Sequence, residues 1–127
     1  MMRVVDTSAW LEWLSDSALG RRVGLELPST EAWIVPTIVQ YELARCLTRE
    51  VSEDAADDTI AFSTECVVTS LSTRLAVQAA EIAKDHALAM ADAIIYATAV
   101  AMGADLLTCD AHFAKLPRVV YIAKGSQ

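Results

Sequence analysis

Short runs of apolar residues alternate along the chain with longer segments in which apolar residues recur every three to four positions. The short runs predict strands and the longer segments predict helices. Strands are expected at residues 2–5, 33–35, 66–69, 106–108 and 119–122. Helices are expected at residues 18–27, 37–50, 52–65, 72–86 and 91–102, and an earlier helix is expected after Thr7 and Ser8, with an apolar face within residues 10–14. Strands that alternate with helices are typical of an α/β fold, and strands without strict apolar–polar alternation favour a parallel sheet buried on both faces.

Two of the predicted strands end at an acidic residue. Asp6 follows the first strand, and Asp110 follows the strand at 106–108. Because ligands of open parallel sheets bind beyond the carboxyl ends of the strands, both acids are candidate site residues. Each could instead cap the N-terminus of the segment that follows it. Since Thr7 and Ser8 could cap the first helix equally well, we expect Asp6 to be free for another role.

Two more acids lie on predicted helices, at places where a charge is unexpected. Glu42 lies at the edge of the apolar arc of the helix at 37–50, where the alternative role is a surface ion pair with Arg45 or Arg49. Asp92 opens a segment that is apolar around its whole circumference, which is typical of a buried helix. A buried carboxylate must be paired or bound to a metal, and no basic residue follows Asp92 within one helical turn. A simple N-cap is the alternative for Asp92.

The composition limits the class of protein. The chain has 127 residues, of which 54% are hydrophobic, so we expect one folded domain over residues 1–127. The longest uncharged segment, residues 93–104, is too short to cross a bilayer, which takes about 20 residues. The chain reaches Asp6 after only two valines, so we expect neither a secretory signal nor a membrane partner. Three cysteines without a close pair favour a reducing, cytoplasmic location and argue against a zinc site.

The net charge of the chain and the four acids indicate the same class of chemistry. The chain has a net charge of −7, which makes a poor electrostatic coat for DNA. Carboxylates that converge repel one another and need protons or hard cations between them, and all-oxygen ligands favour Mg²⁺ or Mn²⁺ over zinc. Such ions activate water and suit phosphodiester hydrolysis. No Gly-rich phosphate loop or Ser/His/Asp order offers a competing chemistry.

An early helix is rich in large apolar residues. Trp10, Trp13 and Leu14 exceed what a small core needs from one helical turn. We therefore expect part of this surface to contact another chain, either a second copy or a different protein. Base stacking by the tryptophans is a less favoured alternative.

Four segments, taken in order, resemble the four acidic motifs of PIN-domain ribonucleases. They are Val4-Val5-Asp6-Thr7-Ser8, Tyr41-Glu42-Leu43-Ala44-Arg45, the segment from Ala91-Asp92 to Ala99, and Leu107-Thr108-Cys109-Asp110-Ala111-His112-Phe113. The length of the chain and the order of the motifs are similar to those of VapC-type toxins of toxin–antitoxin pairs. The resemblance covers nearly the whole chain.

The resemblance implies a central parallel sheet with helices on both sides and Mg²⁺-dependent cleavage of RNA, often tRNA or rRNA, with Mn²⁺ as a possible substitute. It also implies a homodimer and a cognate VapB-type antitoxin whose tail covers the active site. Carried over to this chain, the catalytic and metal-binding cluster would be Asp6, Glu42, Asp92 and Asp110. Ser8 and Thr108 would be supporting hydroxyls.

One departure from the family and three rival interpretations remain open. His112 stands where many relatives have a further acid, so a second metal would bind weakly or arrive with the substrate. A phospho-receiver signalling module would share the length and the acid after the first strand, but it needs an acidic pair before that strand and a closing helix beyond Lys124. A haloacid-dehalogenase-like phosphatase needs Asp at position 8, where this chain has Ser8. A catalytically inactive PIN scaffold is the third alternative.

Overall fold

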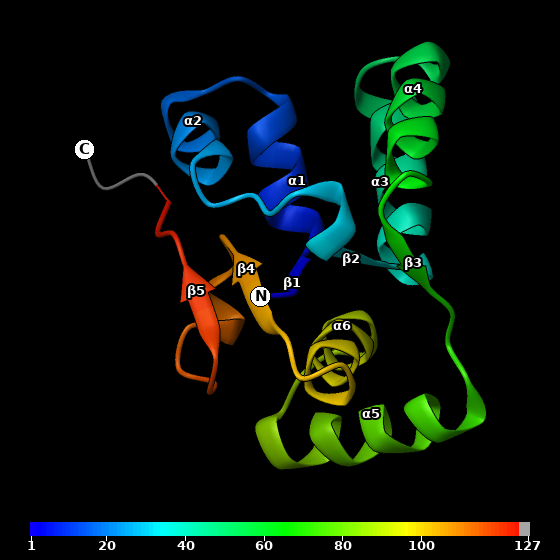
Figure 1. The fold of residues 1–127 in the computed structure, drawn as a ribbon, viewed down its shortest axis with the longest axis vertical. Coiled ribbons are helices and arrows are strands. Elements are labelled where there is room, and N and C mark those ends of the chain that lie inside the picture. Colours follow the sequence, from blue (N-terminus) through cyan, green and yellow to red (C-terminus); the bar gives the residue numbers. More distant parts are fainter. Residues whose placement is uncertain (125–127) are drawn as a thin grey trace.

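The computed structural model describes residues 1–124, and within them a five-stranded parallel sheet organises the chain (Figure 1). The strands are β1 (Arg3–Val5), β2 (Trp33–Pro36), β3 (Val67–Thr69), β4 (Asp105–Thr108) and β5 (Val119–Tyr121). The α-helices are α1 (Thr7–Leu14), α2 (Ala18–Gly24), α3 (Thr37–Glu50), α4 (Glu53–Ser63), α5 (Thr73–His86) and α6 (Met90–Ala101). Two short 3₁₀ helices are η1 (Thr30–Ala32) and η2 (Ala111–Phe113). The α/β fold class is therefore confirmed.

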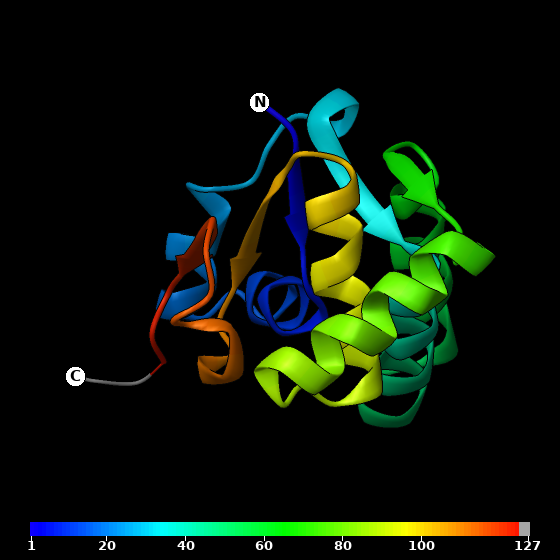
Figure 2. The ribbon, with the colours of Figure 1, turned by 90° about the horizontal axis from the view of Figure 1, so that it is seen from below.

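The strand order is β3-β2-β1-β4-β5, and every neighbouring pair is parallel. The order reverses between β1 and β4, which lie side by side although about a hundred residues separate them (Figure 2). In open parallel sheets the crevice at such a reversal is the usual ligand site. This order differs from the 2-1-3-4-5 order of phospho-receiver-like sheets, so the receiver alternative is wrong.

Helices cover both sides of the sheet, as expected. In Figure 1, α1 and α2 lie on one side, and α5 and α6 lie on the other. Helix α6 is buried almost around its whole circumference, which agrees with its apolar sequence. The strands at the centre carry the fully buried residues Val4, Val5, Leu106 and Leu107. This two-sided burial is why their sequences show no apolar–polar alternation.

One predicted helix ends earlier than expected. The prediction extended it to residue 27, whereas α2 ends at Gly24. Pro28 disfavours a helical backbone at Leu27, the residue that precedes it. The guanidinium of Arg3 also donates a hydrogen bond of 2.7 Å to the backbone carbonyl of Glu26. The chain therefore leaves the helix within reach of Arg3 at the start of β1.

The aromatic residues of α1 serve the core more than a partner. Trp10 is fully buried and its ring centroid lies 4.7 Å from that of Trp33. Trp13 packs at 5.7 Å from Trp33, and Phe62 completes the cluster. Leu14 is the exposed member of the three residues expected to form a contact surface. The expectation of an unpartnered apolar turn is therefore wrong for Trp10, because Trp33 and Phe62 already pack against it.

None of the helices within residues 1–124 is long and apolar enough to cross a membrane.

Candidate active site

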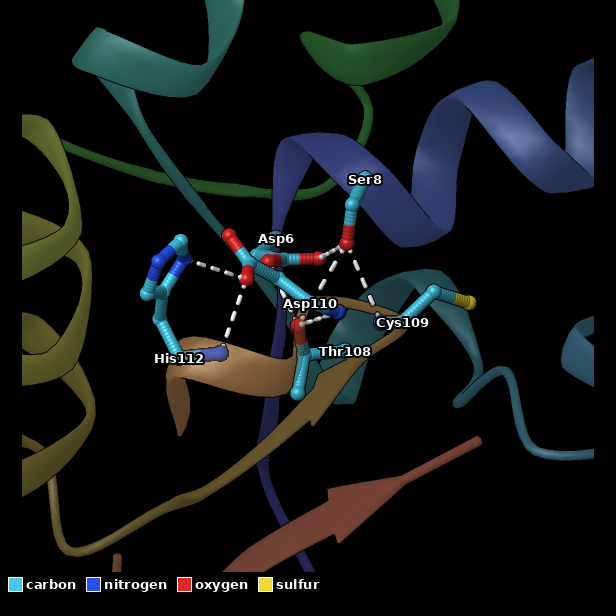
Figure 3. A network of polar contacts seen from close by, with 6 residues as sticks. All are labelled: Asp6, Ser8, Thr108, Cys109, Asp110 and His112. Carbon is cyan, nitrogen blue, oxygen red and sulfur yellow. Dashed lines mark hydrogen bonds and ion pairs between the residues drawn. The ribbon is translucent and has the colours of Figure 1, made fainter. Parts of the chain in front are cut away.

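Asp6 lies at the carboxyl end of β1, and its side chain is buried with only 3% of the residue exposed. One carboxylate oxygen accepts a hydrogen bond from the Ser8 hydroxyl at 2.8 Å (Figure 3). The same oxygen accepts from the backbone N–H of Ala9 at 3.0 Å. The other accepts from the Thr108 hydroxyl at 2.7 Å. The Ala9 bond makes Asp6 the N-cap of α1. The expectation that Asp6 leaves capping to Thr7 and Ser8 is therefore wrong, because one carboxylate caps the helix and faces the site as well.

The environment of Asp6 disfavours its charge. Burial is the largest cause and raises the pKa of Asp6 from 3.8 to about 6. The hydrogen bonds from Thr108, Ala9 and Ser8 oppose this rise, whereas the negative charge of Asp110 adds to it. The three hydrogen bonds to the Asp6 carboxylate thus do not compensate for its loss of hydration. A cation next to Asp6 would favour its ionised form.

Ser8 and Thr108 connect the start of α1 to the end of β4. The Ser8 hydroxyl donates to Asp6 and accepts from the backbone N–H of Cys109 at 3.0 Å. The Thr108 hydroxyl donates to Asp6 and accepts from the backbone N–H of Asp110 at 2.9 Å. Each hydroxyl has one proton, and both protons point to Asp6. Figure 3 shows the resulting network, which fixes the position of Asp6 relative to Asp110.

Asp110 follows β4 and caps the short helix η2 by accepting from the backbone N–H of His112 at 2.9 Å. The same oxygen lies 2.8 Å from Nδ1 of the His112 ring. The His112 side chain is 78% exposed, so the ring projects into solvent next to the cluster. Asp92, Asp110 and His112 each offer a ligand atom, and within residues 1–124 these atoms lie within 4.8 Å of one another. The structure thus brings His112 closer to the acids than its sequence position alone indicated.

Asp92 lies in the first turn of α6, and the N-cap of this helix is Ala89. The N-cap alternative for Asp92 is therefore wrong. Desolvation by burial is the largest cause that raises the pKa of Asp92, and the negative charges of Asp110 and Glu42 raise it further. His112 acts in the opposite direction. The Asp92 carboxylate is therefore within electrostatic reach of Glu42 on α3 and of Asp110 after β4.

Glu42 is half-buried on α3 and accepts a hydrogen bond from the Thr7 hydroxyl on α1. Neither Arg45 nor Arg49 forms an ion pair with it among the described residues, and Arg49 instead contacts Glu50 at 2.9 Å. The surface ion-pair alternative for Glu42 is therefore wrong. Thr7 is a site residue that the sequence did not reveal, because its partner lies 35 positions away.

The four acids suit a hard cation. Within residues 1–124, no lysine or arginine forms an ion pair with Asp6, Glu42, Asp92 or Asp110. Carboxylate oxygens, here from four separate parts of the fold, are the ligands that Mg²⁺ and Mn²⁺ prefer. The Cys109 thiol offers no alternative nucleophile, since burial raises its pKa to about 11. The residues present therefore fit a divalent metal site.

The fold is similar to those of solved toxin–antitoxin proteins. A toxin–antitoxin complex from Klebsiella pneumoniae aligns with 21% identity and a TM-score of 0.79, over 93% of this chain and 95% of that one. VapC20 from Mycobacterium tuberculosis, a toxin that cleaves the sarcin-ricin loop, aligns with 24% identity and a TM-score of 0.75, over 92% and 96%. DNA-bound VapBC from Salmonella typhimurium aligns with 17% identity and a TM-score of 0.72, over 95% and 96%. Among curated protein sequences, none matches this chain significantly.

The sequence leads to the same group of proteins by an independent route. The family profile of the PIN domain matches residues 3–119, from the first residue of β1 to the first residue of β5. All four candidate acids fall within this match, at the carboxyl ends of β1 and β4 and on the helices α3 and α6. This match confirms the resemblance to PIN domains, and the chain belongs to the PIN domain family.

Proposed function

We propose that this PIN domain is a metal-dependent endoribonuclease and the toxin of a VapBC-type toxin–antitoxin pair. One observation carries the nuclease proposal. Asp92, Asp110 and His112 present ligand atoms within 4.8 Å of one another. The negative charge of Glu42 raises the pKa of Asp92, and that of Asp110 raises the pKa of Asp6. A cluster of this kind, without a lysine or arginine partner in the described residues, is unfavourable in the folded protein unless a cation binds to it.

The proposed ligands of the metal are Asp6, Glu42, Asp92 and Asp110. A divalent ion bound there would supply a nucleophilic water at neutral pH and would stabilise the charge on a phosphodiester. Thr7 positions the carboxylate of Glu42, and Ser8 and Thr108 position that of Asp6. Because these hydroxyls already donate their protons to the carboxylates, we assign them a positioning role and not a nucleophilic one.

His112 takes the place of an acid that many relatives have. Its Nδ1 lies next to Asp110, and the ring is exposed to solvent. A neutral imidazole adds a ligand atom without adding a negative charge. We therefore propose that the resting site holds one ion firmly and that a second ion binds weakly or with the substrate.

The proposed partners follow from the family and from the similar structures. Several similar structures are toxin–antitoxin complexes, and one similar toxin cleaves the sarcin-ricin loop. We propose a VapB-type antitoxin that covers the acidic cluster, a homodimer in solution, a structured RNA such as tRNA or rRNA as substrate, and a cytoplasmic location. Light scattering on the purified chain and co-purification with the product of the neighbouring gene test the dimer and the antitoxin.

Cleavage of RNA by the purified protein tests the nuclease proposal. We expect cleavage in Mg²⁺ or Mn²⁺, none in EDTA, and products with a 5′-phosphate and a 3′-hydroxyl, because the attacking group is water. Asp92→Asn should be inactive. Asp57→Asn, the same change at an exposed position on α4, should be as active as the wild type. Equal activity of wild type and Asp92→Asn would assign the cleavage to a contaminant. A folded wild type that binds metal but cuts no RNA would favour the inactive-scaffold alternative.

A further inference from the structure

A cavity of about 220 Å³ lies along α3, and Glu42, one of the proposed metal ligands, is part of its wall. We call it the α3 cleft, and its lining residues are Thr7, Tyr41, Glu42, Arg45, Cys46 and Arg49. Glu42 belongs to both the cluster and the cleft, so a molecule in the cleft touches the site. The cavity is smaller than the roughly 300–1,000 Å³ pockets that enclose whole small molecules. It suits one segment of a longer polymer.

Arg45 is the cation of the α3 cleft with no side-chain partner among residues 1–124. It lies three positions after Glu42, at the spacing that favours an ion pair on a helix, yet the hydrogen bond of Glu42 comes from Thr7. Arg45 is exposed and forms no ion pair with any acid of the described chain. A guanidinium with five unused donors matches the geometry of a phosphate.

Two neighbours of Arg45 extend the same chemistry. Arg49 lies one turn further along α3, and its exposed contact with Glu50 is of the kind that contributes little free energy. Tyr41 lies one turn before Arg45, and 59% of the residue is exposed. An exposed tyrosine ring next to arginines is the combination that binds single-stranded nucleic acid, since bases stack on aromatic rings and arginines contact phosphates.

The charge of the whole protein makes such a cleft necessary for the proposed reaction. The chain has a net charge of −7, and four of its acids are the proposed metal ligands, next to which the scissile phosphate would bind. An RNA strand that approaches the cluster is therefore repelled unless nearby cations hold its backbone. Within the described residues, the α3 cleft combines a direct border on the cluster with two arginines.

We propose that the α3 cleft binds a nucleotide next to the scissile phosphate in a single-stranded segment of the RNA substrate. Arg45, with Arg49, contacts the phosphate of that nucleotide, and the Tyr41 ring stacks on its base. The proposal rests on the proposed nuclease function and adds the residues that hold the strand. It makes Arg45 and Tyr41 positioning residues, because they contact the substrate away from the reacting atoms.

Binding of a fluorescently labelled oligo(A) RNA in EDTA tests the proposal, because no cleavage is expected there. We compare wild type, Arg45→Ala and Arg21→Ala, the last being the same change at an exposed position on α2. Each phosphate contact on a single strand contributes about −0.7 to the slope of log K against log salt concentration. Arg45→Ala should reduce the slope by about this amount. Arg21→Ala should leave the slope unchanged.

The Tyr41 ring has its own pair of variants. Tyr41→Ala should weaken the binding of oligo(A) between about fivefold and 150-fold, the range that corresponds to one stacked base. Tyr41→Phe keeps the ring and should bind as the wild type does. In Mg²⁺, Arg45→Ala and Tyr41→Ala should raise KM more than they lower kcat, since the ions remain in place.

The outcomes separate this proposal from the proposed function. If the wild type cuts RNA while Arg45→Ala keeps both the affinity and the salt slope, the α3 cleft is not the strand site and the nuclease function stands. If the wild type binds oligo(A) with the expected slopes but cuts no RNA, the nuclease function fails and the cleft remains a strand site. No measurable binding of oligo(A) overturns the proposal. So does Arg45→Ala if it loses only binding to a protein partner, because the cleft would then hold a peptide.

Discussion

The charged residues at the two ends of the strand pair β1 and β4 have opposite electrostatic environments. At the amino end, Arg3 of β1 contacts both carboxylate oxygens of Asp105 of β4, at 2.8 and 3.0 Å. At the carboxyl end, Asp6 and Asp110 follow the same two strands, and neither has a lysine or arginine partner within residues 1–124. The ion pair with Asp105 raises the pKa of Arg3, whereas burial raises that of Asp6. The amino end of the strand pair thus favours the ionised form of Arg3, and the carboxyl end disfavours the ionised form of Asp6.

The difference indicates which end contributes to stability and which to chemistry. The pair of Arg3 and Asp105 is bidentate and half-buried, a geometry that fixes the register of β1 against β4. The acids at the carboxyl end lower the stability of the metal-free protein by their desolvation and mutual repulsion. Such perturbed groups at the reversal point of a parallel sheet are typical of functional sites. The predictions below test this contrast.

Activity should show the largest effect. Asp92→Asn and Asp6→Ala should each lower the rate of metal-dependent RNA cleavage by at least about a hundredfold, because a bound metal contributes several kcal/mol to the transition state. Arg3→Met, at the other end of the strands, should keep the specific activity of the folded fraction. Initial rates at saturating Mg²⁺ measure the effect, with folded protein quantified by circular dichroism. Loss of specific activity in folded Arg3→Met would remove the proposed division between the two ends.

Metal should stabilise the protein through the acids at the carboxyl end, so only variants at that end should change the stabilisation. Mg²⁺ or Mn²⁺ at a hundred times its Kd should stabilise the wild type by about 2.7 kcal/mol, through preferential binding to the folded state. The shift in Tm should be much smaller in Asp92→Asn and unchanged in Arg3→Met. Thermal unfolding with and without metal measures it. An equal shift in Asp92→Asn and wild type would show that the ions bind elsewhere.

The ion pair at the amino end should contribute to stability independently of metal. Arg3→Met leaves the Asp105 carboxylate half-buried without a partner and should destabilise the protein by roughly 1–3 kcal/mol. The double variant Arg3→Met/Asp105→Leu should recover part of this loss, because no unpaired charge remains. Urea unfolding in EDTA gives the free energies of unfolding. A double variant less stable than Arg3→Met would contradict the assignment.

The smallest effect is a pH dependence at the carboxyl end. The pKa of Asp92 is raised in the folded protein, so the folded state binds this proton more tightly than the unfolded state does. Below the ordinary pKa of aspartate the group is protonated in both states and carries no penalty. The penalty appears as pH rises through the folded-state pKa. In EDTA, Asp92→Asn should therefore be about as stable as the wild type near pH 3 and more stable near pH 8.

Calorimetry of wild type and Asp92→Asn at several pH values measures this difference. The Asp57→Asn variant on α4 is the control, and its stability relative to wild type should not follow the same trend. A difference between wild type and Asp92→Asn that shrinks as pH rises would show that the Asp92 charge is favourable in the fold.

Much of the fold could be predicted from local patterns. The helix predicted at 37–50 coincides with α3, because Pro36 marks its start and its apolar residues keep helical spacing. The end of α2 could be predicted only in part, since Pro28 is a local signal for it but the contact between Arg3 and the Glu26 carbonyl depends on the packed structure. Short-range signals thus define the elements, and long-range contacts adjust where they end.

The candidate site divides in the same way. Asp6 and Asp110 were predictable because they follow apolar strands, and Asp92 because it interrupts an apolar helix. The hydrogen bond between Thr7 and Glu42, and the freedom of Arg45 that results from it, could not be predicted from helical spacing. Spacing alone favoured a pair between Glu42 and Arg45. A contact between α1 and α3, 35 positions apart, decided against it.

The two roles of Asp6 have a consequence for how the proposed activity can be lost. Asp6 caps α1 and receives the hydroxyl protons of Ser8 and Thr108, so replacing it by alanine removes three hydrogen bonds from a buried site. Asp92 caps nothing and is repelled by its neighbours, so its loss relieves the fold. Under selection against the activity, escape mutations should therefore accumulate at codon 92 before codon 6. Inactive descendants of the protein should then keep Asp6, because it still caps α1.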